Sequence, residues 1–134
     1  MSGESRPRAE PKCPFCDLAG HSGLVVERGT VFAVEDRYPV SPGHTLVIPR
    51  RHTPDYFAMT AEERRDAEEL LLLLRERLLA ADQTIEGFNV GMNCGEAAGQ
   101  TVPHAHIHLI PRRRGDTPQP RGGVRGVIPA KMSY

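Results

Sequence analysis

The chain has 134 residues, with 17 basic and 17 acidic side chains, so its formal net charge is zero. This balance argues against proteins that follow a nucleic-acid polymer or coat an anionic membrane, whereas a local cluster is enough to bind a small anion. The length suits one domain with one core. The longest apolar run, residues 70–74, is far shorter than a membrane span, and no secretory signal pattern opens the chain. We therefore expect a cytoplasmic protein without a membrane or nucleic-acid partner.

The N-terminal part of the chain combines a polar tail with a cysteine pair. Residues 1–12 lack apolar periodicity, and we expect a flexible tail. Cys13 and Cys16 follow with the spacing of a zinc knuckle, but a tetrahedral site needs two further ligands. An empty reduced pair or a redox pair is the alternative, although a redox pair should open a helix after a strand. For Cys94 we expect a buried thiol or a thiol on a strand.

Short strands alternate with turn residues through the first half of the chain. Residues 24–27 and 31–35 are β-like runs joined at Gly29, which predicts a hairpin. A Pro- and Gly-containing loop over 38–43 then leads through His44 into an apolar strand over Thr45–Pro49. Asp55–Met59 is expected to be a brief helical turn or a connector.

A long helix is predicted over residues 60–81. Thr60 is a good N-cap, and Glu63 completes a capping box. Apolar residues recur at helical spacing and form one stripe, consisting of Ala67, Leu70, Leu71, Leu74, Leu78 and Ala81. Leu72 and Leu79 fall outside this stripe. Either a broad core absorbs them, or the helix contributes to a dimer interface.

A strand over Glu86–Cys94 and a loop over 95–99 precede the most informative segment, residues 104–110. Its three histidines alternate with small and apolar residues, so a β-strand would place all three imidazoles on one face. At a rise of ~3.3 Å per residue, neighbouring rings stand roughly 6.5 to 7 Å apart. This spacing suits different atoms of one phosphate, or a metal. The ordinary alternative is a satisfied polar strand face.

Substitution at a nucleotide phosphorus needs a nucleophile and donors for the developing charge. A neutral imidazole is a competent nucleophile, and its ordinary pKa of about 6.5 leaves it largely neutral at physiological pH. The middle histidine, His106, is flanked by the other two, and we predict that it is the nucleophile.

The segment His-Ala-His-Ile-His-Leu-Ile over 104–110 resembles the signature of the histidine triad (HIT) family. Residues 99–103, residues 43–49 and Asn93 also resemble that family, in the same order and spacing. The resemblance covers residues 13–112, which we expect to form one HIT domain. It implies an α+β, HIT-like fold with a five-stranded antiparallel sheet, one long helix and one short helix. The absence of regular βαβ alternation agrees with this fold class.

The resemblance also implies roles for individual residues. His106 would form a nucleotidyl-histidine intermediate that water hydrolyses, and Asp36 would bind the ribose. The phosphate-binding candidates are His108, His44, Asn93, Gln100 and Thr101. Asp36 and Asn93 are also ordinary turn formers. Thr101 has ordinary strand propensity, and His44 is also readable as a plain loop histidine. Candidate walls of a base pocket, each equally readable as core, are Phe15, Leu18, Phe32 and Ile48.

In zinc-bearing members of this family two distant histidines complete the cysteine pair, and the matching positions here are His52 and His104. The implied metal ligands are thus Cys13, Cys16, His52 and His104. A closed four-ligand site leaves no position for a metal-bound water, so the zinc would be structural. It would attach the N-terminal segment to the triad.

The function that we expect is a nucleotide hydrolase that attacks the α-phosphate of a nucleoside phosphate derivative. The substrate is a dinucleoside polyphosphate such as diadenosine tetraphosphate, or an adenosine phosphoramidate. A nucleotidyl transferase or phosphorylase would use the same intermediate, and a non-catalytic nucleotide-binding module would keep the fold. His108 favours hydrolysis, because transferases of the family commonly have glutamine there. The family also implies a homodimer through the 60–81 helix and a neighbouring strand.

The C-terminal extension, residues 113–134, is expected to pack on or near the site. Residues 124–128 suggest a short strand or a cover over the sheet. Five arginines in and before this extension indicate either a solvated strand end or a collector of polyphosphate that added salt would weaken; they are Arg112, Arg113, Arg114, Arg121 and Arg125. Residues 121–129 resemble the tail of many bacterial HIT proteins, but no chemistry follows from that resemblance.

Overall fold

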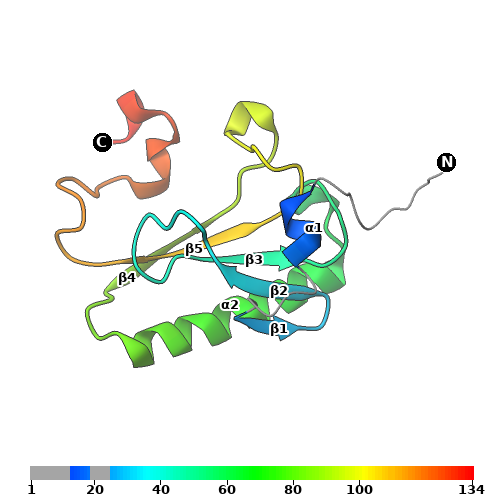
Figure 1. Cartoon of the computed structure of the whole chain (residues 1–134). Helices are drawn as coiled ribbons and strands as arrows, with labels where there is room; N and C mark the ends of the chain where they lie inside the picture. The colour runs from blue at the N-terminus through cyan, green and yellow to red at the C-terminus, as the bar shows by residue number, and fades with distance from the viewer. Residues whose placement is uncertain (1–12, 19–24) are drawn as a thin grey trace.

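The computed structural model describes residues 13–18 and 25–134, and the predicted tail over 1–12 lies outside them. Five strands form one antiparallel sheet in the order β1-β2-β3-β5-β4 (Figure 1). The strands are β1 Val26–Arg28, β2 Val31–Glu35, β3 Thr45–Pro49, β4 Gly87–Gly91 and β5 Ile107–Arg112. Two α-helices accompany them, α1 Pro14–Leu18 and α2 Ala61–Ala81. The predicted fold class, with one long and one short helix, is confirmed, although the sequence did not place the short helix at residues 14–18.

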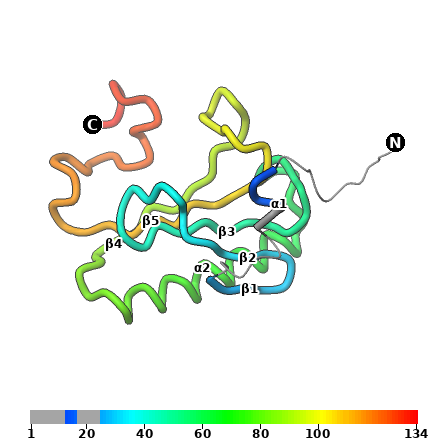
Figure 2. The backbone as a smooth tube through the Cα atoms, in the orientation of Figure 1, coloured from blue at the N-terminus to red at the C-terminus, as the bar shows by residue number. Residues whose placement is uncertain are grey.

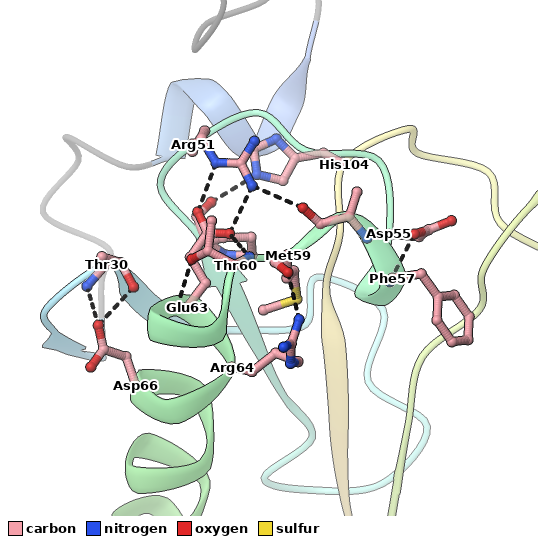
Figure 3. A network of polar contacts seen from close by, with 12 residues as sticks. Thr30, Arg51, Asp55, Phe57, Met59, Thr60, Glu63, Arg64, Asp66 and His104 are labelled. Atoms are coloured by element: carbon pink, nitrogen blue, oxygen red, sulfur yellow. Dashed lines mark hydrogen bonds and ion pairs between the residues drawn. The ribbon is translucent and has the colours of Figure 1, made fainter.

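Helix α2 begins where the capping pattern predicts. The Thr60 hydroxyl accepts from the Glu63 N–H at 3.0 Å, and the Thr60 N–H donates to the Glu63 carboxylate at 2.8 Å. Asp66, one turn further on, accepts two hydrogen bonds from Thr30 and so attaches the β1–β2 turn to the helix (Figure 3). The short helical turn expected before α2 is the 3₁₀ turn η2, Tyr56–Ala58, capped by the Asp55 side chain.

The sheet has two differently covered faces. On one face α2 packs over the alternate residues of the triad segment in the main core (Figure 1), which contains Ala67, Leu70, Leu74, Ala105, Ile107 and Leu109. On the other face Phe15 of α1 packs against a smaller cluster formed by Phe32, Val34, Leu46 and Ile48. Leu72 is 58% exposed and lies outside both clusters. The histidines of the triad segment therefore project away from the main core.

The strand boundaries around the triad differ from the prediction. Strand β5 begins at Ile107 rather than His104, because the backbone N–H of Ala105 donates to the Thr53 carbonyl at 2.7 Å instead of joining the sheet. Strand β4 is correspondingly shorter than the predicted 86–94, since Gly91 pairs with His108 close to the start of β5. Only His108 of the triad thus lies within a strand.

The C-terminal extension forms no strand over 124–128, contrary to one of the two expectations. It instead forms two 3₁₀ turns, η4 Gly123–Val127 and η5 Pro129–Lys131, and returns over β4 and β5 (Figure 2). Gly122 has a φ of 96°, and a Cβ at this position would lie 1.9 Å from the Met132 carbonyl oxygen. A glycine is therefore required where the extension folds back on itself.

Within residues 13–18 and 25–134, no helix combines the length and the apolar character that crossing a bilayer demands.

Candidate active site and metal centre

Four sulfur and nitrogen atoms converge where α1 meets the start of the triad segment. The ring nitrogen Nδ1 of His104 lies 3.4 Å from Cys13 Sγ, 3.6 Å from Cys16 Sγ and 3.2 Å from His52 Nδ1. His52 Nδ1 lies 3.3 Å from Cys16 Sγ. A tetrahedral zinc ion with two sulfur and two nitrogen ligands separates its ligand atoms by roughly 3.3 to 3.8 Å. The side chains fit a metal ion of this type.

The hydrogen bonds around this cluster leave its ligand atoms available. His104 Nε2 donates to the Pro49 carbonyl at 2.8 Å, and since a carbonyl only accepts, the lone pair of the ring is on Nδ1. The backbone N–H of Cys16 faces Cys13 Sγ at 3.4 Å. Burial lowers the pKa of His104 below its ordinary value, with the nearby His52 acting in the same direction and the Pro49 hydrogen bond opposing it. A neutral imidazole is the form that binds a metal.

An ion pair that the sequence did not reveal positions the loop of His52. The Arg51 guanidinium donates two hydrogen bonds to the buried Glu63 carboxylate, at 2.9 and 2.8 Å, and a third to the Ala58 carbonyl (Figure 3). Burial alone would raise the pKa of Glu63, but hydrogen bonds from Arg51 and Thr60 hold it below its ordinary value. Glu63 therefore both caps α2 and fixes the residue next to a candidate metal ligand.

The orientation of His106 leaves one nitrogen free to attack. Its Nδ1 lies 2.8 Å from the His104 carbonyl oxygen and must carry the proton, so the lone pair is on Nε2. Phe15 packs edge-on against this ring, with centroids 4.9 Å apart, and His106 keeps 8% of its surface exposed. The ring of His108 lies 5.2 Å away, centroid to centroid. The two rings thus lie on the same side of the segment, as predicted.

His44 and His108 are joined in a chain of hydrogen bonds with a definite direction. The Val40 N–H donates to His44 Nδ1 at 3.1 Å, so the proton of neutral His44 is on Nε2. That nitrogen lies 2.9 Å from His108 Nδ1, to which it donates. His108 consequently carries its own proton on Nε2. This series of hydrogen bonds leaves the Nε2–H of His108 free to donate to an anion bound beside it.

Both imidazoles in this chain are held in the neutral form. Burial lowers the pKa of His44 below its ordinary value, and the Asp36 carboxylate partly offsets this. Burial also lowers the pKa of His108, and the neighbouring His106 and His44 lower it further against the influence of Asp36. The donor direction described above is therefore the state expected at physiological pH.

Asp36, His44 and His108 also bring three potential metal ligands within 4.8 Å of one another. His44 Nε2 lies 3.4 Å from Asp36 Oδ2. To bind a cation, however, this nitrogen would have to give up its proton, and Nδ1 would then carry one opposite the Val40 N–H. Two facing donors repel, so the arrangement favours a proton chain over a metal site.

The remaining predicted phosphate-binding residues differ in whether they line the cavity beside the triad. A cavity of about 600 Å³ borders His44 and His108 and is also lined by Asn93. Thr101 is exposed on the preceding loop and does not line that cavity. The Gln100 amide is engaged in bracing its own loop, through the Gly95 N–H and the Pro54 and Val102 carbonyls.

The ribose and base candidates come from α1, β2, β3 and the residue after β2. Asp36 lies at the end of β2 and accepts from the Tyr38 N–H at 2.8 Å, which is the turn-forming contact. Its second oxygen faces His44. Phe15 packs on the smaller apolar cluster, in which Phe32 and Ile48 are fully buried, so these two are core residues. Leu18, the fourth base-pocket candidate, has a side chain outside the described residues.

The arginines at the end of β5 are paired within the chain. Arg112 pairs with Asp116, Arg113 with Asp82 and Arg114 with Glu86, each at 2.8 Å. Hydrogen bonds from Thr84 and Arg113 lower the pKa of Asp82 to about 2. These contacts favour the ordinary interpretation of the cluster, a solvated and charge-balanced strand end, over a collector of polyphosphate.

Comparisons with known proteins agree with this geometry. The model of the HIT domain matches residues 20–115. The chain is 37% identical over 115 residues to the AP-4-A phosphorylase of Mycobacterium tuberculosis strain H37Rv, covering 81% of this chain but only 57% of that relative. It is 39% identical over 80 residues to the asymmetrical bis(5′-nucleosyl)-tetraphosphatase of Schizosaccharomyces pombe, covering 58% of this chain and 42% of that relative. The crystal structure of a HIT family protein from Bacillus anthracis superposes with a TM-score of 0.73 at 37% identity, covering 81% of this chain and 78% of that one.

Proposed function

The chain belongs to the HIT domain family, and from that premise we propose that it is a nucleotide hydrolase acting at the α-phosphorus of a dinucleoside polyphosphate. The observation that carries the proposal is the oriented pair of imidazoles. His106 has its lone pair on Nε2 because Nδ1 donates to the His104 carbonyl, and His108 has its proton on Nε2 because Nδ1 accepts from His44. One ring is prepared to attack and its neighbour to donate.

In the first half of the reaction, His106 Nε2 attacks the α-phosphorus and forms a P–N bond. The P–O bond to the remaining polyphosphate breaks, and the leaving oxygen departs with the bonding electrons. In the second half, water attacks the same phosphorus, a P–O bond forms, and the P–N electrons return to His106. The proton of the water passes to solvent, and a nucleoside monophosphate is released. The covalent intermediate divides one difficult displacement into two.

The neighbouring side chains stabilise the charge that develops on the phosphate oxygens. His108 donates through Nε2, and its direction is fixed by His44. Asn93 supplies a neutral amide donor from the same cavity. Donors that are oriented before the reaction need no reorganisation during it, which is the main advantage of such a site over water.

The nucleoside that stays on the enzyme is assigned to the α1 side of the triad. Asp36 is the proposed ribose ligand. The half-buried Phe15 is the proposed wall for the base, because Phe32 and Ile48 behind it are fully buried. Gln100 and Thr101 are proposed to act on the phosphate through their loop.

A zinc ion held by Cys13, Cys16, His52 and His104 would supply structural cross-linking rather than catalysis, since four protein ligands complete its coordination. His104 then has two functions within the chain. Its ring is a ligand of the cluster, and its backbone carbonyl sets the tautomer of His106. A single residue, His104, thus connects the proposed metal centre to the orientation of the proposed nucleophile.

We also propose a homodimer. Strand β4 is an edge of the sheet, and Leu72 on α2 is 58% exposed. Light scattering on the eluting protein tests this proposal, and a monomer mass at all accessible concentrations would contradict it.

A phosphorylase is the second candidate, because one relative carries that name. Both enzymes would form the same adduct and differ in the acceptor of the nucleotidyl group. With diadenosine tetraphosphate, water yields AMP and ATP, whereas orthophosphate yields ADP and ATP.

Product analysis with and without orthophosphate distinguishes the two enzymes. Hydrolysis predicts AMP formation at an unchanged rate when phosphate is added. Replacing His106 by alanine should lower turnover by on the order of 10⁴-fold while nucleotide binding is retained. A wild-type rate as negligible as that of the variant would favour a non-catalytic binding module.

A further inference from the structure

The cavity beside the triad is larger than the phosphate chemistry alone requires. Its volume is about 600 Å³, within the 300–1,000 Å³ typical of sites for whole small molecules. It begins at His44 and His108 and extends along β4 and β5. Gly91, which pairs with His108 across the sheet, has open space where a side chain would stand. The missing side chain at Gly91 therefore leaves room in the cavity directly beside His108.

The far wall of this cavity is the C-terminal extension. Its lining side chains are mainly apolar and comprise Val124, Val127 and Met132 from the extension, with Val90 and Met92 from β4 and the residues after it. Val124 and Val127 line this cavity and keep 66% and 72% of their surfaces exposed. An apolar ligand would remove these surfaces from water.

The extension is folded as a defined structure. Arg121 and Arg125 lie over the ring of Tyr134, at 4.9 and 4.8 Å from its centroid. Gly122 allows the close approach of Met132 described above, and Gly123 is close to Asn89 of β4. The glycine- and arginine-rich sequence of residues 121–129 thus serves to hold Val124, Val127 and Met132 over the sheet.

The charges around the cavity select for a neutral group at this end. Arg112 lines it, but the guanidinium is occupied by two hydrogen bonds to Asp116 and one to Asn89. Its cation is therefore already balanced. Polar contacts at the cavity come from side chains without net charge, such as Asn93 and Thr117. A flat, neutral group with hydrogen-bonding edges, such as a nucleobase, matches this lining.

We infer that the C-terminal extension forms a second-nucleoside subsite, in which Val124, Val127 and Met132 hold the base of the leaving nucleotide of a dinucleoside polyphosphate. The inference rests on the proposed function and extends it, because it makes residues 117–132 the element that selects dinucleotides over mononucleotides. The triad lies between the two nucleosides. Helix α1 and the extension lie over opposite ends of the same side of the sheet (Figure 1), so the subsite under the extension is separate from that on the α1 side.

The test compares two ligands that differ only in the second nucleoside, diadenosine tetraphosphate and adenosine 5′-tetraphosphate. Affinities are measured by calorimetry in a His106→Ala background, so that turnover is not needed. We expect diadenosine tetraphosphate to bind about tenfold more tightly. Val124→Ser with Val127→Ser should reduce this ratio several-fold. Both positions are exposed, so the fold should persist.

Two further variants make the result specific. Ile128→Ser alters an exposed apolar residue of the same extension that does not line the cavity, and it should leave the ratio unchanged. Gly122→Ala should displace Met132 and lower the ratio by a different route. A ratio near one in the parent protein, or equal loss of both ligands in the valine variant, would overturn the inference. Failure of the proposed function is seen separately, as the absence of turnover in the protein that retains His106.

Discussion

Two clusters in this molecule have similar spacing between their potential ligand atoms. They differ in whether the histidine nitrogen that faces the centre carries a lone pair or a proton. The metal cluster, Cys13, Cys16, His52 and His104, and the proton chain, Asp36, His44 and His108, each gather their nitrogen, sulfur or oxygen atoms within 4.8 Å. In the metal cluster the far nitrogen of His104 donates to a carbonyl, which leaves a lone pair at the centre. In the proton chain the far nitrogen of His44 accepts from an N–H, which leaves a proton at the centre.

The difference shows that the backbone group behind an imidazole determines what the front of the ring can do. The Pro49 carbonyl leaves a lone pair on the candidate ligand His104, the His104 carbonyl leaves one on the proposed nucleophile His106, and the Val40 N–H leaves a proton on His44 Nε2. Distances between side chains alone would have suggested two metal sites. Each of the following changes disturbs one cluster and should leave the other intact.

The largest effect is expected from Cys13→Ser, which removes a ligand from the metal cluster. If the free zinc concentration is about a thousandfold above the dissociation constant, loss of the bound zinc lowers the free energy of unfolding by about 4 kcal/mol. Metal analysis and thermal unfolding measure the two consequences. Asp36→Asn is the matched control, and it should retain one zinc per chain. A zinc content in the wild type well below one per chain would contradict the assignment.

Replacement of His44 by alanine disturbs the proton chain alone. His108 then loses the donor that fixes its tautomer, and kcat/KM should fall by about 10- to 100-fold. Steady-state kinetics measure the loss, while zinc content should match the wild type. A loss of zinc in this variant would show that the two clusters are not independent.

Arg51→Ala should weaken the metal cluster indirectly. The Glu63 carboxylate is 4% exposed and would lose its counter-ion, at a cost of about 1 to 3 kcal/mol in the free energy of unfolding, reduced because Arg51 itself is partly exposed. Denaturant unfolding measures this cost. Arg51→Lys keeps the charge but not the two-pronged geometry, and an intermediate value is expected. Equal stability of all three proteins would contradict a stabilising role of the Arg51–Glu63 ion pair.

The smallest effect is a pH dependence from the proton chain. Because the folded protein lowers the pKa values of His44 and His108, the unfolded chain binds more protons, and stability rises with pH. This contribution is complete above the ordinary value of about 6.5 and is lost as the pH falls from there through the folded pKa values. The difference in unfolding free energy between wild type and His44→Ala should therefore shrink on acidification. A difference that grows would reverse the assigned sign.

The fold was largely predictable from sequence because its signals are local. The capping box at Thr60 and Glu63 and the alternation through Ala105, Ile107 and Leu109 each need only neighbouring residues. The start of β5 was not predictable, because it depends on a hydrogen bond from Ala105 to the distant Thr53. Helix α1 is too short for periodicity to reveal.

The sequence predicted that Cys13, Cys16, His52 and His104 come together, as they do here, but it did not predict where the protons of the histidines lie. The donor direction of His44 depends on the backbone of Val40, and the position of His52 depends on Arg51 reaching Glu63 across the fold. No motif encodes either contact. The cavity wall formed by residues 117–132 likewise depends on where the extension returns, which Gly122 permits but does not by itself specify.

The central claim is that His106 attacks phosphorus through a nitrogen whose lone pair is set by the His104 carbonyl. The most direct measurement is rapid quenching of the protein with diadenosine tetraphosphate under conditions that avoid acid, followed by peptide mass spectrometry. The account predicts one adenylyl group, attached to His106 and absent from the His106→Ala protein. Turnover without any adduct, or an adduct on His44 or His108, would contradict it.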